Sequence, residues 1–214
     1  MVCLEELYTE IHYPPLIAKH MMPSTDAALN RIKELQYQVA VYDDQVAYKT
    51  LFFLLFPSLQ TFAFTITHCR ETAEEIASDL CIDIWVKRTK LQEIENLKLY
   101  LFICARNAAF KNVRQHRKQV NISLDELQVE FNADYANPEE EINIKELRHK
   151  ISSAIKSLPP SCQLIYKLAK EEGFRYKDIA SLLDVSVKTI DAQLAIALKK
   201  IAVALDVPVT KKRF

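Results

Sequence analysis

The chain has 214 residues, half of them apolar, and its formal net charge is zero at a pI near 7.0. This length is enough for two small domains or one mid-sized domain. Gly173 is the only glycine, which excludes a glycine-rich phosphate loop and argues against an all-β fold with many tight hairpins. The abundance of Ala, Leu, Ile, Lys and Glu instead predicts an all-α protein.

The cysteines and the N-terminal sequence bear on the cellular compartment. The five cysteines form no CxxC pair, so we expect buried, reduced thiols of a cytoplasmic protein, without a metal site. Glu5, Glu6 and Glu10 stand where a secretory signal has basic and apolar residues. The most apolar stretch, 51–56, is shorter than the about 20 residues that span a bilayer. We therefore expect a soluble protein.

Charge is unevenly distributed along the chain. Residues 1–99 hold nine basic and fourteen acidic residues, and residues 100–119 hold five basic and none acidic. Residues 120–148 hold two basic and eight acidic residues, and residues 149–214 hold twelve basic and six acidic. Two basic segments separated by an acidic one indicate two contacts with a polyanion, joined by a segment that avoids it.

The N-terminal half is predicted to be helical after a loose extension over 1–24, where Met21 or Met22 is an alternative start of the chain. The first helix is expected over 27–42. Asp43 and Asp44 then open a strongly apolar helical stretch that reaches Ile66. Pro57 lies inside this stretch, so a kink or break is expected near Phe56.

An acidic helix is predicted over 72–85. Its apolar side is regular, and Glu75, Asp79 and Asp83 follow one another at intervals of four. Like charges at this spacing slightly destabilise an isolated helix. The row therefore indicates either a binding partner or a solvated acidic face, and the spacing alone leaves both open.

A polar loop over 87–96 leads to a basic helix predicted over 97–118. Opposite its apolar row lie Asn107, Lys111, Arg114 and Lys118, and Arg106 and Arg117 extend the positive surface. Several cations without nearby acids repel one another unless an anion neutralises them, and nucleic acid phosphates are the obvious anion. A merely solvated basic helix is the alternative.

An acidic linker is expected over 119–147, with a helix beginning inside it at Pro138 and continuing to about Ser157. Leu158-Pro159-Pro160 breaks that helix. Ser161 is the expected cap of the next helix, which ends near Gly173.

The strongest local pattern lies in the last third of the chain. A short helix is predicted over 176–183, a turn at Asp184-Val185, and a longer helix from Val187 with Ser186 as its cap. A short helix, tight turn and longer helix in this order are typical of a helix-turn-helix. A helical hairpin that only packs a core gives the same pattern.

The order of these segments resembles one family. ETAEEIASDLCIDIW (71–85), YLFICARNAAFKNVRQHRK (100–118) and SLPPSCQLIYKLAKEEGFRYKDIASLLDVSVKTIDAQLAIALKKI (157–201) are similar to conserved segments of RNA polymerase sigma factors of the extracytoplasmic-function group. The resemblance covers about residues 43–203. It implies a helical region 2 domain at 25–118, the linker at 119–147, a helix-turn-helix region 4 domain at 148–207 and a basic tail at 208–214.

The resemblance also implies roles for single residues. The clamp of core RNA polymerase would bind the acidic helix, at Glu75, Asp79, Asp83 and Trp85. The loop 87–96 would receive a base flipped from the minus-ten element. Residues implied in minus-ten DNA binding are Lys87, Asn96, Tyr100, Asn107, Lys111, Arg114, Arg117 and Lys118. The acidic linker would thread toward the RNA channel.

The second domain would dock on the polymerase flap and bind the minus-thirty-five duplex. The implied residues are Arg175, Tyr176, Lys177, Ser186, Lys188, Thr189 and Gln193. The family often has His or Asn and an Arg on the exposed face of this helix, whereas this chain has few basic groups there. That departure predicts weak affinity for the element or readout of DNA shape.

The function that follows is promoter recognition and melting by a transcription initiation factor that is not an enzyme. No small-molecule substrate is expected, and the five histidines are scattered without a catalytic pattern. The partners that the resemblance implies are core RNA polymerase and promoter DNA. Factors of this group are commonly held inactive by an anti-sigma protein, and nothing in the chain identifies one. A conventional dimeric helix-turn-helix regulator is the alternative, and it leaves the acidic helix before the basic one unexplained.

Overall fold

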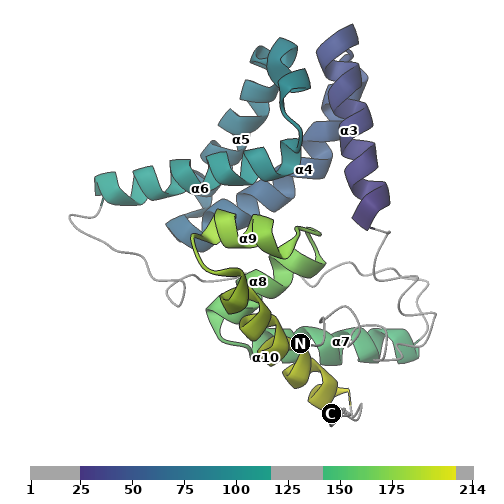
Figure 1. The fold of residues 1–214 in the computed structure, drawn as a ribbon, viewed down its shortest axis with the longest axis vertical. Helices are drawn as coiled ribbons and strands as arrows, with labels where there is room; N and C mark the ends of the chain where they lie inside the picture. Colours follow the sequence, from purple (N-terminus) through teal and green to yellow (C-terminus); the bar gives the residue numbers. More distant parts are fainter. Residues whose placement is uncertain (1–24, 117–141, 206–214) are drawn as a thin grey trace.

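The computed structural model describes residues 25–116 and 142–205, and every regular element in these ranges is a helix (Figure 1). The predicted all-α fold is thereby confirmed. The expected extension 1–24, residues 119–141 of the linker, Arg117 and Lys118, and the tail 208–214 lie outside the described residues.

The first half of the chain forms four α-helices and one short 3-10 helix. They are α3 (Thr25–Tyr42), α4 (Gln45–Thr67), α5 (Arg70–Val86), η1 (Arg88–Glu93) and α6 (Leu97–His116). The central helix is α4, which packs against α3, α5 and α6. The carboxylate of Asp44 caps it by accepting hydrogen bonds from the backbone N–H groups of Val46 at 2.8 Å and Ala47 at 3.1 Å.

A kink or break was predicted near Phe56, and the break does not occur. The helix runs for 23 residues with Pro57 inside it, because its inner face is held by buried residues on both sides of the proline, among them Leu55 and Leu59. The unbroken helix is long and apolar enough to cross a membrane, which the stretch 51–56 alone is not. A core helix passes the same test, and α4 buries eight residues against its neighbours.

The second half forms four helices, α7 (Ile142–Lys156), α8 (Pro160–Lys170), α9 (Tyr176–Leu183) and α10 (Val187–Ala204). The linker expected over 119–147 therefore ends in helix from Ile142 onward. The expected cap at Ser161 is wrong: Pro159 is the capping residue, Pro160 occupies the first turn and Ser161 is buried. Proline suits a first turn because the N–H that it lacks has no partner there.

The turn between α9 and α10 is made without glycine. Asp184 has φ 55° and ψ 47°, in the left-handed region, where Asp is tolerated better than most residues. Ser186 then caps α10, as predicted, and its hydroxyl oxygen accepts the Thr189 N–H at 3.0 Å. The arrangement is a helix-turn-helix.

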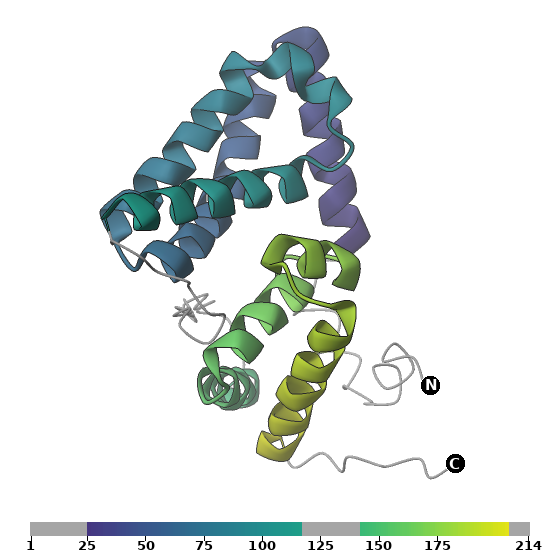
Figure 2. The same ribbon diagram turned by 60° about the vertical axis from the view of Figure 1, so that its left-hand side comes forward.

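The two halves of the chain pack on each other. In Figures 1 and 2, α9 lies against α6, and α10 points away from the first half. The rings of Phe102 in α6 and Phe174 before α9 meet edge to face, with centroids 4.9 Å apart. Their contact makes the hydrophobic core continuous through both halves.

Candidate nucleic-acid and protein interfaces

The outer face of α5 carries acidic and apolar side chains together. Glu75, Asp79 and Asp83 are all exposed. Between and beyond them Ile82 is 55% and Val86 64% exposed. Residues 75, 79, 82, 83 and 86 share one helix face because they are three or four apart, and exposed apolar groups among acids are a recognised feature of protein-binding surfaces.

Trp85 does not belong to this exposed face. Its ring packs against Tyr48 with centroids 5.0 Å apart, and the Arg88 guanidinium lies 4.9 Å above it. Arg88 also pairs with Asp43, at the junction of α3 and α4. The tryptophan therefore joins η1 to α4. Its predicted contact with polymerase could only use the part of the ring that stays exposed.

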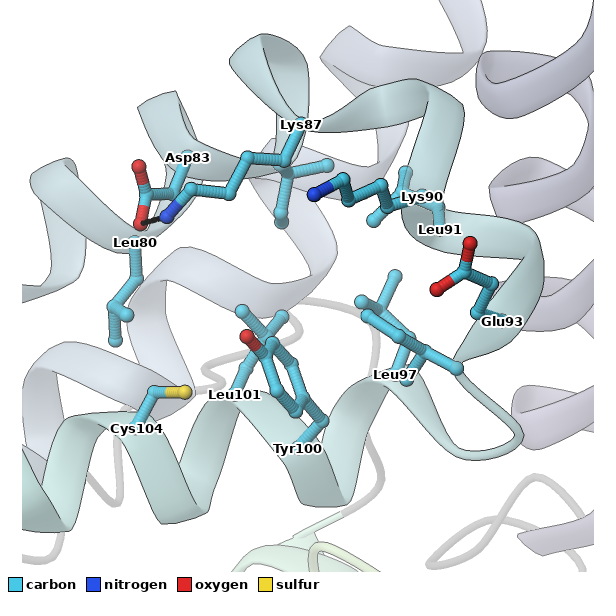
Figure 3. A pocket seen from close by; sticks show the side chains of 12 residues that line it. Leu80, Asp83, Lys87, Lys90, Leu91, Glu93, Leu97, Tyr100, Leu101 and Cys104 are labelled. Atoms are coloured by element: carbon cyan, nitrogen blue, oxygen red, sulfur yellow. Dashed lines mark hydrogen bonds and ion pairs between the residues drawn. The ribbon is translucent and has the colours of Figure 1, made fainter.

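A cavity of about 300 Å³ opens between α5, η1 and α6 (Figure 3). Its inner wall is apolar and its rim is polar. Lys87, Lys90 and Glu93 lie on one side of it, and Tyr100 lies across from them on α6. The lining residues are Leu80, Asp83, Ile84, Lys87, Lys90, Leu91, Glu93, Ile94, Leu97, Tyr100, Leu101 and Cys104.

The structure thus brings Lys87 and Tyr100, two of the predicted minus-ten residues, to one cavity. The Lys87 ammonium donates to Asp83 at 2.5 Å, and this hydrogen bond raises the pKa of Lys87, which stays charged at neutral pH. A hydrogen bond with Cys104 raises the pKa of the Tyr100 phenol, which stays protonated. The rim therefore offers two lysine side chains, two carboxylates and one protonated phenol ring.

Asn96, also predicted to bind minus-ten DNA, lies at the start of α6. Its side-chain oxygen accepts the backbone N–H of Leu99 at 3.1 Å, so it caps the start of α6. It does not line the cavity. Asn96 thereby fixes the residue at which α6 begins, and with it the position of Tyr100.

Gln36, which the sequence did not single out, binds the 3-10 helix η1 that lines the cavity. Gln36 in α3 is only 7% exposed, and its amide nitrogen donates to the carbonyl oxygens of Leu91 at 2.6 Å and Ile94 at 2.8 Å. Both carbonyls belong to η1 and its end. A glutamine inside an otherwise apolar helix face is the only signal that could have indicated this role, because buried polar groups need partners.

The cationic face of α6 is exposed as predicted for Asn107, Lys111 and Arg114. The helix has no acidic residue between Leu97 and His116. Arg106 is placed differently, because it donates to the Asn107 side-chain oxygen at 3.0 Å and to the carbonyl oxygens of Ser181 and Leu182. Arg106 therefore joins the two halves of the chain.

The helix-turn-helix exposes only some of its predicted DNA-binding residues. Arg175, Lys177 and Lys188 are exposed, and Tyr176 is half-buried. Thr189 is engaged with the capping Ser186, whose hydroxyl lies 2.8 Å from the Thr189 hydroxyl. Gln193 accepts a hydrogen bond from the Cys162 thiol of α8, so its side-chain oxygen is turned toward the domain.

Small and apolar side chains occupy most of the outer face of α10. Val187 is 43% and Ile196 46% exposed, and Ala192 and Ala195 are exposed between them. Lys188 and Lys199 stand at the two ends of this face. Within residues 25–116 and 142–205, no cluster of His, Cys, Asp and Glu is arranged to hold a metal ion.

Two family models match the chain in the order of its two halves. Sigma-70 region 2 matches residues 54–119, and sigma-70 region 4 matches residues 148–209. Together they cover more than half of the sequence. The chain belongs to the extracytoplasmic-function group of the sigma-70 family of RNA polymerase sigma factors.

It therefore acts in transcription initiation, with core RNA polymerase and promoter DNA as the partners that these regions imply. The family is not one of enzymes.

Comparison with other proteins adds distant likenesses. No curated protein matches the chain. The sigma factor RpoE of Bartonella quintana, solved with the anti-sigma factor NepR, is 23% identical with a TM-score of 0.47, over 75% of this chain and 97% of that one. CnrH, solved with the cytosolic domain of CnrY, is 16% identical with a TM-score of 0.45, over 82% and 97%. Both scores lie below 0.5, so the assignment rests on the two region matches.

Proposed function

We propose that this sigma factor docks on core RNA polymerase through α5, captures and melts the minus-ten element with α6 and its cavity, and binds the minus-thirty-five duplex with α10. The observation that carries the proposal is the cavity rimmed by Lys87 and Tyr100 beside the exposed cationic face of α6. In this proposal residues 25–118 and 148–207 act as separate domains, and an anti-sigma partner stays a prediction from the resemblance.

The polymerase-docking surface is the outer face of α5. Asp79 and Asp83 supply charge, and Ile82 and Val86 supply apolar area that is left open to water in the free chain. Burying the exposed parts of these two side chains against a basic partner would contribute about 1–2 kcal/mol each. The combination supports a partner surface with cations around an apolar centre.

The cavity suits one unstacked nucleobase. At about 300 Å³ it lies at the small end of ligand pockets. Its apolar wall can cover the faces of a base, and the Tyr100 ring at the rim can stack on the base or on its neighbour. Lys87 at the entrance, which pairs with Asp83 in the free chain, would exchange that carboxylate for the phosphate of the flipped nucleotide.

The cationic face of α6 would hold the strand from which that base comes. Lys111 and Arg114 are exposed without acidic neighbours on their helix. Single strands bind to a cationic track combined with aromatic stacking, and α6 carries both, with Tyr100 in its first turn and the cations further along. Binding of the separated strand would stabilise the melted state over the duplex.

We propose that α10 reads the minus-thirty-five element mainly through apolar contacts. Thr189 and Gln193 have internal partners, whereas Val187, Ala192 and Ile196 lie on the outer face. In the major groove the apolar group that distinguishes one base is the thymine methyl. Lys188 and Lys199 would hold the flanking phosphates, so the face favours A·T pairs over G·C pairs.

Gel filtration with bacterial core RNA polymerase, followed by transcription from a pool of genomic promoters, tests the proposal. The chain should co-elute and direct initiation from a defined set of start sites. Asp79→Arg should abolish co-elution, and Arg114→Glu should abolish initiation while leaving co-elution intact. Glu74→Arg is the matched control, because Glu74 is exposed on α5 beside the docking face. Stable dimers on palindromic duplexes, without polymerase binding, would favour a conventional regulator.

A further inference from the structure

Gln193 on α10 is bound by a side chain of another helix. The Cys162 thiol of α8 donates a hydrogen bond to the side-chain oxygen of Gln193. Cys162 is only 1% exposed, and α8 and α10 pack side by side (Figure 2). The thiol therefore binds the glutamine from inside the domain, where little water competes for the contact.

The position of Gln193 on α10 borders the face proposed for DNA. Ile196, which is exposed, follows it by three residues, and residues three apart are neighbours on a helix surface. On the other side, Leu194 and Ala197 are fully buried. Gln193 itself is half-buried. It thus lies at the edge between the outer face and the core, from which a long side chain can point either way.

A glutamine needs both ends of its amide to recognise adenine. In the major groove its nitrogen donates to adenine N7, while its oxygen accepts from the N6 amino group. The oxygen of Gln193 accepts the Cys162 thiol instead, so it is not available to N6. In this orientation Gln193 cannot make the bidentate pair with adenine.

Thr189, the other uncharged polar residue predicted to read bases from α10, also has an internal partner. Its hydroxyl lies 2.8 Å from the hydroxyl of Ser186, which caps the helix. Ala192, Ala195 and Ile196 on the outer face have no hydrogen-bonding group in their side chains. The orientation of Gln193 therefore decides whether this part of α10 offers an amide to the bases.

We propose that Cys162 determines promoter specificity by holding Gln193 away from the DNA, which excludes adenine readout by this glutamine from minus-thirty-five recognition. Cys162 is a positioning residue, because it is buried and would touch no base. While Gln193 is held, the outer face distinguishes bases through the thymine methyl. The inference rests on the proposed function of α10, whereas the contact between the two side chains does not.

Adenine and the thiol compete for the same oxygen. Pairing with adenine requires that the contact with Cys162 break first, so the apparent affinity for adenine falls with the small population in which Gln193 is released. Without the thiol, the oxygen of Gln193 would face the domain without a donor, which is unfavourable for a buried acceptor. The side chain should then turn toward water and the groove.

Selection of duplexes from a random pool by the holoenzyme tests the role of Cys162. Cys162→Ala should acquire a preference for adenine at one position of the element, on the order of tenfold over the other bases. The double variant Cys162→Ala/Gln193→Ala should lose that preference. Gln193→Ala alone should select the wild-type element, as should Cys162→Ser, which keeps a hydrogen-bond donor. Cys81→Ala, which removes a buried thiol from α5, is the control.

Selection of the wild-type element by Cys162→Ala would overturn the proposal, as would an adenine preference that survives in the double variant or arises in Cys162→Ser. Circular dichroism checks that each variant is folded. Cys162→Val, which fills the space of the thiol without a donor, gives the same test should Cys162→Ala not fold.

Nuclear magnetic resonance of the free, isotope-labelled chain examines the contact without DNA or polymerase. The side-chain amide signals of Gln193 should shift in Cys162→Ala and return toward their wild-type positions in Cys162→Ser. Identical signals in all three chains would overturn the contact and with it the proposal. Failure of the wild-type holoenzyme to select any element would contradict the proposed function, while these signals would still decide whether the thiol holds Gln193.

Discussion

The side-chain amide of Gln36 donates to the carbonyl oxygen of Leu91 across a separation of 2.6 Å, and α3 thereby holds the loop that lines the cavity. The same amide reaches Ile94. Because one nitrogen satisfies two carbonyls at the rim of the cavity, the shape of that rim depends on a residue remote in sequence and without any proposed contact to DNA. Gln36 thus shapes the cavity without lining it, whereas residues such as Tyr100 line the cavity and would contact the base.

Gln36→Leu should destabilise η1 more than it destabilises the fold. The substitution keeps roughly the buried volume but removes the donor of the Ile94 carbonyl and leaves the Leu91 carbonyl with the Ile94 backbone N–H, at 3.1 Å. A carbonyl that stays buried without a donor costs about 1–3 kcal/mol. We expect a lower melting temperature in calorimetry and reduced promoter opening in permanganate footprinting, with unchanged co-elution with core polymerase. Gln38→Leu on the same helix is the control. Normal promoter opening by Gln36→Leu would contradict the positioning role.

Two substitutions of Tyr100 should distinguish the contribution of its ring to DNA binding from that of its hydroxyl. Stacking on a base contributes about 1–3 kcal/mol, so Tyr100→Ala should weaken binding of a fluorescent minus-ten single strand to the holoenzyme by roughly fivefold or more. Tyr100→Phe keeps the ring and loses only the hydrogen bond with Cys104, so its binding should stay close to wild type. Equal losses in both variants would show that the hydroxyl, and not stacking, carries the contact.

Thymine methyl groups should carry much of the minus-thirty-five readout. Once duplexes have been selected from a random pool with the holoenzyme, replacing each selected dT by deoxyuridine removes only the methyl. Burial of such a group contributes about 0.8 kcal/mol, so each contacted position should lose about fourfold in affinity. Ile196→Ser should reduce this discrimination, and Val203→Ser, further along the helix, is the control. Selection of G·C-rich elements, or no effect of deoxyuridine, would refute apolar readout.

The cysteines should differ in reactivity. Burial raises the pKa of the Cys81 thiol from 9.0 to about 11, so at pH 8 only about one thiol in a thousand is ionised. Mass spectrometry should find Cys69 and Cys104, which are half-buried, alkylated well before Cys81. Because the folded pKa is the higher one, stability should fall between about pH 9 and 11, where only the unfolded chain loses this proton. Rapid labelling of native Cys81 would contradict its burial.

The periodic parts of the fold were predictable from the sequence, and the contacts between distant segments were not. The capping Ser186 and the acidic face of α5 follow from local spacing, and the structure agrees. A kink or break was expected near Phe56, but the helix continues through Pro57 because packing on both sides favours an unbroken helix. The thiol expectation held for Cys81 and Cys162, which are buried, but Cys69 and Cys104 are only half-buried.

The candidate site shows the same division. Exposure of Lys111 and Arg114 could be read from helix periodicity. The turning of Gln193 toward Cys162 could not, because it depends on how α8 packs against α10. Gln36 was missed for the same reason, since its partner Leu91 lies 55 residues away along the chain. The sequence pattern predicts which face of a helix is exposed. Tertiary packing decides which side chains on that face are left without a partner inside the protein.

Promoter-directed transcription with purified core RNA polymerase tests the central claim most directly. Core polymerase would be supplied with ribonucleotides and a pool of genomic promoters, with and without this protein, and the RNA 5′ ends would be mapped. We predict initiation at a defined set of start sites only when the protein is present, lost with Arg114→Glu and retained with Glu74→Arg. The same scattered 5′ ends with and without the protein would contradict a role as a promoter-recognising initiation factor.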